Sequence, residues 1–272
     1  MAFPWTFHTT FIPNSTPVIP ADYLNQSQEI FAALVAQTGL GVQKCWVHCY
    51  DGVNLTWETL HGAIVRDSVL GIYTAPVLPS TPSTVGVSGF SASTWYYVYE
   101  TSISRVASFT VSTTPPGADL RWMGTDDTKR FLFSFKTTAA GLIDPFTHRD
   151  GVTEYMGGDI SARPETPALI ASSTLTVIPL TYCPPHARRV LLYIRIENHN
   201  SLGEILHLFP KGVQAVSVSP ATAGRCIAST GLYQDFRIWM ETDSTPAIEG
   251  FLGFANPADN ALITVAGWNE FR

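Results

Sequence analysis

The sequence carries little charge, and its basic residues are scattered. Only 14% of its 272 residues are Asp, Glu, Lys or Arg, and the formal net charge is −6. Contacts to nucleic-acid phosphates need grouped Lys or Arg side chains. The one notable basic pair, Arg188-Arg189, is typical of a surface site at the start of a strand. The composition therefore argues against nucleic acid as a partner.

Long apolar runs and cysteines are also scarce. No stretch of about 18 apolar residues occurs, so we expect no membrane-spanning helix. The N-terminus lacks the basic segment and apolar core of a secretory signal. Four cysteines are too few for a disulfide framework in a chain of this length.

Two of the cysteines lie near histidines, which makes a metal site one alternative. Cys45 and Cys49 are close in sequence to His48 and His61. On a strand, Cys-x3-Cys places both thiols on one face and His48 on the other, whereas zinc needs converging ligands. We therefore expect buried core thiols and no bound metal.

Motifs for catalysis and cofactor binding are lacking. There is no phosphate-binding loop and no His-Glu-x-x-His. His148-Arg149-Asp150 has the letters of a kinase catalytic loop, but a glycine-rich loop before it and an Asp-Phe-Gly segment after it are both missing. We interpret this segment as a polar linker, and we expect no enzyme activity and no cofactor.

Carboxylates leave one enzymatic alternative open. A glycosidase needs two carboxyl groups roughly 5 to 10 Å apart, and the sequence does not tell which of its acids converge. Asp126-Asp127 lies between Gly124 and Lys129, a pattern that favours a hairpin turn. The remaining candidates are Asp144, Asp150, Glu154 and Asp159.

The sequence is rich instead in aromatic residues, Pro and Gly, and much of it alternates with a period of two. Between 93 and 147, Trp95, Tyr97 and Tyr99 are expected on one face of a strand, opposite Tyr96 and Val98. A later strand is expected to place three rings on one face, those of Phe131, Phe133 and Phe135. Alternation of this kind between turn residues predicts antiparallel strands. Asp51-Gly52 predicts a further hairpin, with Cys45, Val47 and Cys49 on one face of its first strand.

The second half of the chain predicts another all-β block. Val190, Leu192, Ile194 and Ile196 form one fully apolar face, as in a strand packed on a sandwich core. We expect strands over 173–180, 188–198, 204–209, 213–218, 234–242, 247–254 and 261–268. Residues 148–167 are polar and break the pattern, so we place a domain boundary there. The predicted division is an arm and helix over 1–40, a β domain over 41–150 and a β-sandwich or jelly-roll-like domain over 168–272.

The N-terminal 40 residues predict the one helix of an otherwise all-β protein. Asp22 is a suitable N-cap, and apolar residues follow it at helical spacing until Gly39 or Gly41. The preceding arm is punctuated by Pro yet strongly apolar, so we expect it to lie against the protein body or a neighbouring subunit. The expected docking or oligomer contacts are Phe3, Trp5, Phe7, Phe11, Leu24, Phe31 and Leu34.

Two stretches resemble bacteriophage tail-fibre and related virion structural proteins. The first is WYYVY at 95–99, followed by FTVSTTPPGADLRW, GTDDTKRFLFSF and GLIDPF, which ends at 146. Its closing turn departs from the Ser-Gly-Asn form found in that family. The second, NSTPVIPADYLNQSQE at 14–29, is similar to the TPVxADWLNxxQ segment near the start of such proteins. Together they cover about a quarter of the chain.

The resemblance implies a non-enzymatic virion structural protein, either a tail fibre or a tail-tip or attachment component, docked by its N-terminal arm and helix. It further implies a homotrimer that contacts other virion proteins and a host cell-surface glycan or protein, after synthesis in the host cytoplasm. Alternatives are a head decoration or fibre protein, a carbohydrate-binding module and a polysaccharide depolymerase. Receptor contacts are expected on distal loops, represented by Asn200, Ala221, Ser244 and Asn256.

Overall fold

The computed structural model describes residues 45–60, 64–74, 76, 83–86, 88–156, 175–197, 204–211, 225–229, 233–242, 246–253 and 260–270. The regular structure of these residues consists of strands, which confirms the all-β class that alternation predicts. The expected arm and helix over 1–40 lie outside the described residues.

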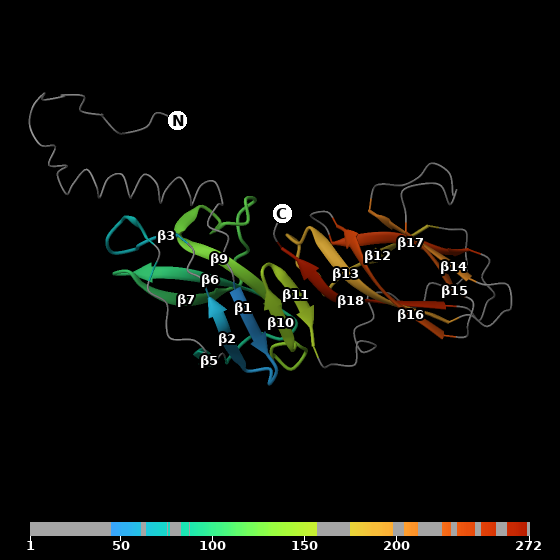
Figure 1. The fold of residues 1–272 in the computed structure, drawn as a ribbon, viewed down its shortest axis with the longest axis horizontal. Coiled ribbons are helices and arrows are strands. Elements are labelled where there is room, and N and C mark those ends of the chain that lie inside the picture. The colour runs from blue at the N-terminus through green and yellow to red at the C-terminus, as the bar shows by residue number, and fades with distance from the viewer. Residues whose placement is uncertain are drawn as a thin grey trace, which may run out of the picture.

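One eight-stranded antiparallel sheet contains strands from both halves of the sequence (Figure 1). Its order is β16-β13-β18-β11-β10-β1-β2-β5. In chain order these strands are β1 (Cys45–Cys49), β2 (Asn54–Leu60), β5 (Ser83–Gly86), β10 (Phe146–Arg149), β11 (Val152–Tyr155), β13 (Arg189–Glu197), β16 (Tyr233–Glu241) and β18 (Asn260–Asn269).

Two four-stranded sheets complete the fold. The module sheet has the order β7-β6-β9-β8 and consists of β6 (Trp95–Ile103), β7 (Val106–Ser112), β8 (Trp122–Met123) and β9 (Asp126–Lys136). The C-terminal small sheet has the order β12-β17-β14-β15 and consists of β12 (Thr176–Pro179), β14 (Glu204–Pro210), β15 (Arg225–Ser229) and β17 (Ala247–Gly253). A short pair, β3 (Val65–Arg66) and β4 (Tyr73–Thr74), lies beside the module sheet.

Both small sheets pack on the same face of the eight-stranded sheet, which gives a sandwich-like arrangement. Pairing along the large sheet places one set of buried residues on that face, from Val47 through Phe146 and Trp268 to Val190. A single hydrophobic cluster joins them to Phe133 and its neighbours in the module sheet and to Ile178, Leu206, Leu208 and Ile248 in the C-terminal small sheet. The largest part of the core is therefore shared.

The predicted alternation is confirmed along β1 and β13. Cys45, Val47 and Cys49 are buried while Trp46 is exposed, and every second residue of β13 from Val190 to Ile196 is fully buried. The predicted turn at Asp51-Gly52 is confirmed as well. Its Asp51 carboxylate accepts hydrogen bonds from the backbone N–H groups of Val53 and Asn54, and Gly52 has a φ of 78°.

One predicted alternation is wrong. Phe131 does not share a face with Phe133 and Phe135, because the pairing of β6 with β9 shifts between Val98 and Tyr99. A bulge of this kind inserts one residue into one strand and reverses the alternation beyond it. As a result, Phe131 packs with Tyr97 and Tyr99 on the second face of the module sheet, while the other two rings join the shared core.

The polar linker expected at His148 is also wrong. Residues 146–155 form the β10–β11 hairpin near the centre of the large sheet, with Asp150 and Gly151 at its turn. Both turn residues have positive φ, 50° and 85°, the condition for a type I′ turn. Strand β11 pairs with β18, so one sheet contains strands from either side of the expected boundary. The remainder of that boundary, 157–167, lies outside the described residues.

Most of the expected C-terminal strands are confirmed with ends within about three residues. Strand β15 was not expected from the sequence, and it pairs with β14 at the edge of the C-terminal small sheet. The expected strand over 213–218 lies outside the described residues.

Candidate functional site

The residues that the sequence put forward for docking and receptor contact lie outside the described residues. They are Phe3, Trp5, Phe7, Phe11, Leu24, Phe31 and Leu34 in the N-terminal segment, and Asn200, Ala221, Ser244 and Asn256 in the loops. Their assignments remain predictions.

The Asp126-Asp127 pair lies at the start of β9, where both carboxylates have partners of their own. Asp126 accepts hydrogen bonds from the N–H and hydroxyl of Thr128 and pairs with Lys129 at 3.1 Å. Asp127 accepts a 2.7 Å hydrogen bond from the Tyr73 hydroxyl. Burial and this carboxylate raise the pKa of Tyr73 to about 12. Asp127 therefore ties β9 to the β3–β4 segment, whereas Asp126 is held by residues of β9 itself.

The carboxylate of Asp67 is buried beside the β6–β7 hairpin. It accepts hydrogen bonds from the Ser102 hydroxyl at 2.6 Å and from the backbone N–H of Arg105 at 2.6 Å, and further ones from Val69, Leu70 and Ser104. Burial disfavours its ionised form, but these donors outweigh that effect and hold the pKa of Asp67 well below its ordinary value. Its role is structural.

The cysteines and histidines near the N-terminal hairpin do not converge. Cys45 and Cys49 are buried, free thiols in the shared core, and burial raises the pKa of each. His48 lies on the outer face of β1, stacked on Tyr50 at 4.1 Å and 3.7 Å from Glu58. Across the part of the chain that the structure describes, no group of three or more His, Cys, Asp or Glu side chains is arranged to hold a metal ion.

His148 is fully buried beneath the module sheet. Its Nδ1 lies 2.8 Å from the Thr153 hydroxyl, and its ring stacks on Phe133 with centroids 5.0 Å apart. Burial lowers the pKa of His148 to about 4, although the charges of Glu270 and Asp150 act in the opposite direction. The sequence predicts a polar linker at this residue, but in the structure His148 is a neutral member of the core near pH 7.

Glu270 is another buried carboxyl group with several hydrogen-bond partners. Its Oε1 accepts hydrogen bonds from the N–H and hydroxyl of Ser134 and from the Trp268 indole at 3.0 Å, and it lies 3.2 Å from His186 Nε2. The side chain is fully buried. Because Ser134 belongs to β9 and Trp268 to β18, this carboxyl group joins the module sheet to the large sheet.

Aromatic rings surround this network. The Tyr97 and Phe131 rings lie 5.5 and 5.3 Å from that of His186. Burial and the charge of Glu270 raise the pKa of Tyr97 to about 12. The Tyr99 hydroxyl donates a 2.7 Å hydrogen bond to the Thr114 carbonyl. The second face of the module sheet is therefore a small core of its own, with a polar centre.

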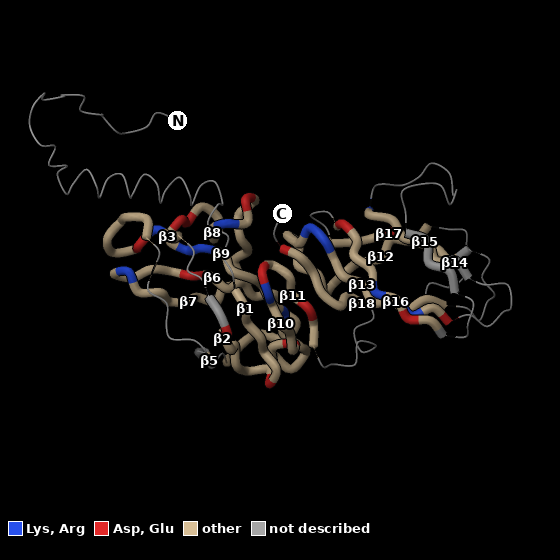
Figure 2. Tube along the Cα trace, viewed as in Figure 1, with Lys and Arg blue, Asp and Glu red and all other residues tan. Residues whose placement is uncertain are grey.

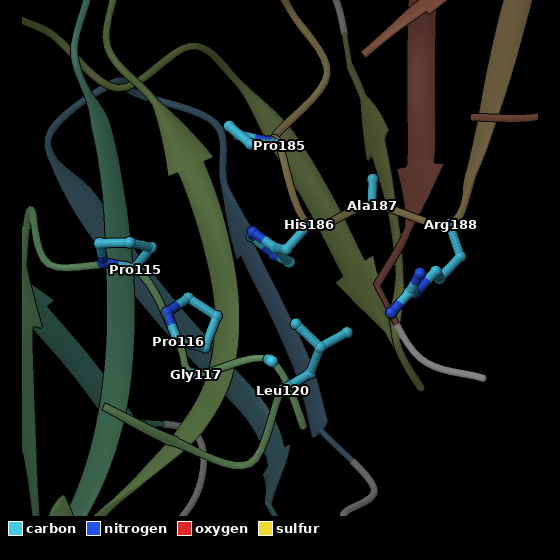
Figure 3. A pocket seen from close by; sticks show the side chains of 9 residues that line it. Pro115, Pro116, Gly117, Leu120, Pro185, His186, Ala187 and Arg188 are labelled. Atoms are coloured by element: carbon cyan, nitrogen blue, oxygen red, sulfur yellow. The ribbon is translucent and has the colours of Figure 1, made fainter. Parts of the chain in front are cut away.

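His186 also lines a pocket of about 340 Å³. One wall is the β7–β8 connection, and the other is the segment that leads into β13 (Figure 3). Figure 2 shows basic residues where the chain enters β13. The lining residues are Pro115, Pro116, Gly117, Ala118, Leu120, Pro185, His186, Ala187 and Arg188. We call this cavity the His186 pocket. Its walls are mainly apolar with a few polar groups, as is typical of ligand sites.

The backbone of the β7–β8 connection is closely packed where it forms the pocket wall. A Cβ on Gly117 would lie 2.5 Å from the Gly124 carbonyl oxygen, so this approach requires glycine. The backbone N–H of Gly117 donates to Trp122, and that of Leu120 donates back to Gly117. Leu120 has a φ of 57°, which is uncommon for a branched side chain and costs about 1–3 kcal/mol. The fold holds Leu120 at the pocket in spite of that cost.

Comparisons with known proteins give no functional assignment. No protein-family model matches the chain, and no curated protein is similar to it. The described part of the chain contains no helix of the length and apolarity that a membrane crossing needs.

Sequence reasoning missed both His186 and Glu270. Neither belongs to a recognisable motif, and 83 residues separate them. The one signal near the pocket is the Pro115-Pro116-Gly117 run, which marks a rigid connection. Asp150-Gly151 was a clearer signal, because the same Asp-Gly dipeptide marks the correctly predicted turn at 51–52.

Proposed function

We propose that this chain is a non-enzymatic structural protein of a virus particle, with a tail-fibre, tail-tip or attachment role. The observation that carries the proposal is the structural use of its buried acids. Glu270 and Asp67 each bind several donors that connect distant strands. A protein that must remain folded on a particle needs such cross-connections, whereas a glycosidase needs carboxyl groups directed at a substrate.

The resemblance of residues 14–29 and 95–146 to phage virion proteins supports the same role. The all-β architecture is compatible with it, because rigid sheets can carry variable contact loops at their ends. The proposed arrangement is a homotrimer docked through residues 1–40, with the loops around 200, 221, 244 and 256 distal and directed at a host surface glycan or protein.

Quantitative mass spectrometry of purified particles tests the virion assignment. Particles of the virus that encodes this chain should contain it at a constant copy number, a multiple of three, after density-gradient purification and a salt wash. A soluble protein of the infected cell provides the control for carry-over. Absence of the chain from washed particles would refute the proposal.

Oligomeric state gives a second, independent test. If the proposed trimer is obligate, its interfaces should be large, typically more than about 2,000 Å². The purified full chain should then remain assembled and sediment as a trimer at micromolar concentration. Phe31→Ala should weaken that assembly while leaving the circular dichroism of the β-sheets unchanged. A stable folded monomer would argue against the trimer and against the docking role of the N-terminal segment.

A further inference from the structure

Exposed aliphatic side chains are concentrated at one end of the module sheet. Of the ten large hydrophobic residues of the described chain that are exposed, four lie in two short turns. Val69 and Leu70 belong to the β3–β4 turn, and Ile103 and Val106 lie on either side of the β6–β7 turn. We call residues 68–71 and 103–106 the module tip. Single exposed apolar residues are ordinary, whereas a group of them indicates a contact surface.

A buried carboxylate joins the two turns into one unit. Asp67 accepts hydrogen bonds from two backbone N–H groups of the β3–β4 turn and from two of the β6–β7 turn. Ser104 and Arg105 have positive φ although neither is glycine, and such residues are concentrated at functional sites that the surrounding structure holds in place. The fold therefore presents the apolar side chains on a fixed backbone. The four N–H donors are those of Val69, Leu70, Ser104 and Arg105.

The place and size of the module tip favour a flat partner over a protein. In Figure 1 the β3–β4 loop and the turn between β6 and β7 lie together at the left end of the strands. The four aliphatic side chains are between 47% and 65% exposed, so they present a few hundred Å² of surface. A stable protein interface needs about 800 Å² from each partner. The tip also contains none of the aromatic side chains that anchor protein interfaces.

The charge of the module tip favours an anionic surface. Arg105 is the one charged residue of the tip, and it is exposed. The neighbouring Asp67 is buried, and its carboxylate is bound by N–H donors. Apolar side chains beside a basic residue are typical of segments that bind the surface of anionic membranes. We propose that the module tip inserts shallowly into the headgroup region of a lipid bilayer that contains anionic lipids. This inference goes beyond the virion role and does not rest on it.

Co-sedimentation of the purified full chain with liposomes tests the proposal. The chain should bind vesicles of phosphatidylcholine and phosphatidylglycerol at about 1 mM lipid, as expected for a small apolar contact without a second anchor. It should bind vesicles of phosphatidylcholine alone about fivefold less tightly, because one basic residue near an anionic surface contributes about that factor. Arg105→Ala should abolish this preference and keep the weaker binding that the apolar side chains provide.

Two leucines of equal exposure locate the contact. Leu70 in the module tip is 47% exposed, and Leu142 in the turn after β9 is 46% exposed. Leu70→Ser should weaken liposome binding about fivefold or more, because it removes an aliphatic side chain that enters the bilayer. Leu142→Ser should leave the binding unchanged. A second matched pair is Val106→Ser in the tip and Val177→Ser on β12, where the two valines have similar exposure.

Circular dichroism of each variant shows that the sheets are intact. The proposal fails if the parent chain binds neither kind of vesicle at about 10 mM lipid, or if the two leucine variants lose binding equally. Sedimentation velocity without lipid examines the alternative of a second copy of this chain. If Leu70→Ser dissociates an oligomer that Leu142→Ser leaves intact, the module tip is a contact between copies and the lipid proposal is overturned.

Discussion

The module sheet and the C-terminal small sheet pack on the same face of the large sheet, but they differ in their second faces. The second face of the module sheet buries Tyr97, Tyr99 and Phe131 around the Glu270 network. The second face of the C-terminal small sheet also buries rings, those of His207, Phe209 and Phe251, but it has no such polar network among the described residues, and Val177 on its edge strand β12 is 53% exposed. Strict alternation identifies residues that share a face, but it does not reveal whether other segments cover that face.

Loss of the Glu270 carboxyl group, which lies at the centre of the module sheet's second face, should lower the free energy of unfolding more than any other change considered below. Glu270→Ala leaves the buried donors of Ser134 and Trp268 without an acceptor, so the free energy of unfolding should fall by about 4 kcal/mol. Glu270→Gln, which keeps one acceptor oxygen, should lose less. Urea denaturation followed by tryptophan fluorescence provides the measurement.

Glu154→Ala is the matched control for the Glu270 variants, because Glu154 is exposed on β11 in the same sheet. It should change the free energy of unfolding by at most about 0.5 kcal/mol. Equal effects at the two positions would show that the polar centre does not hold the module sheet in place.

The next prediction compares a buried position on the second face of the module sheet with an exposed position on the edge strand of the C-terminal small sheet. Phe131 is 1% exposed between aromatic rings, so Phe131→Ala should lower the free energy of unfolding by about 3–4 kcal/mol. Val177→Ala should lower it by no more than about 0.5 kcal/mol, because more than half of that side chain is already in solvent. A large loss at Val177 would mean that an interface covers the C-terminal small sheet.

Two buried histidines should make the free energy of unfolding depend on pH. His148 has a folded-state pKa of about 4, against about 6.5 when unfolded, so it is neutral in both states above pH 6.5. As the pH falls from 6.5 to 4, the unfolded chain takes up a proton that the folded chain excludes. The free energy of unfolding should therefore fall by about 3 kcal/mol over that window.

Urea titrations at several pH values check this prediction. His148→Gln should remove most of the loss between pH 6.5 and 4. His207→Gln provides the comparison on the C-terminal small sheet, where burial also lowers the pKa of the histidine. It should remove less, because His207 keeps some exposure whereas His148 has none. The assignment to His148 would be wrong if its replacement left the pH dependence unaltered.

Sequence patterns predicted the all-β class, the β1–β2 hairpin and most C-terminal strands, because each depends on neighbours along the chain. The same patterns could not predict the bulge in β9, because it is the pairing with β6 that moves Phe131 to the other face. Sequence patterns could not predict the His186 pocket either. Its two walls contain Leu120 and His186, which are far apart in the sequence and are brought together by long-range packing.

The smallest predicted effect concerns the turn between β6 and β7. Ser104 and Arg105 both have positive φ, 52° and 66°, as in a type I′ turn, yet neither is the Asn or Gly that this turn favours. The Asp67 carboxylate accepts hydrogen bonds from both backbone N–H groups, and these bonds hold the turn in place. The turn at Asp150-Gly151 has the same geometry with a favoured sequence.

Arg105→Gly should therefore raise the free energy of unfolding by about 0.5–1 kcal/mol, because glycine adopts positive φ without strain and keeps the N–H that binds Asp67. Arg105→Ala is the control, since it removes the same exposed side chain but retains the strain, and it should give no gain. Thermal denaturation of both variants beside the parent chain measures the difference. An equal gain from alanine would indicate that removal of the arginine charge, and not relief of backbone strain, stabilises the module sheet.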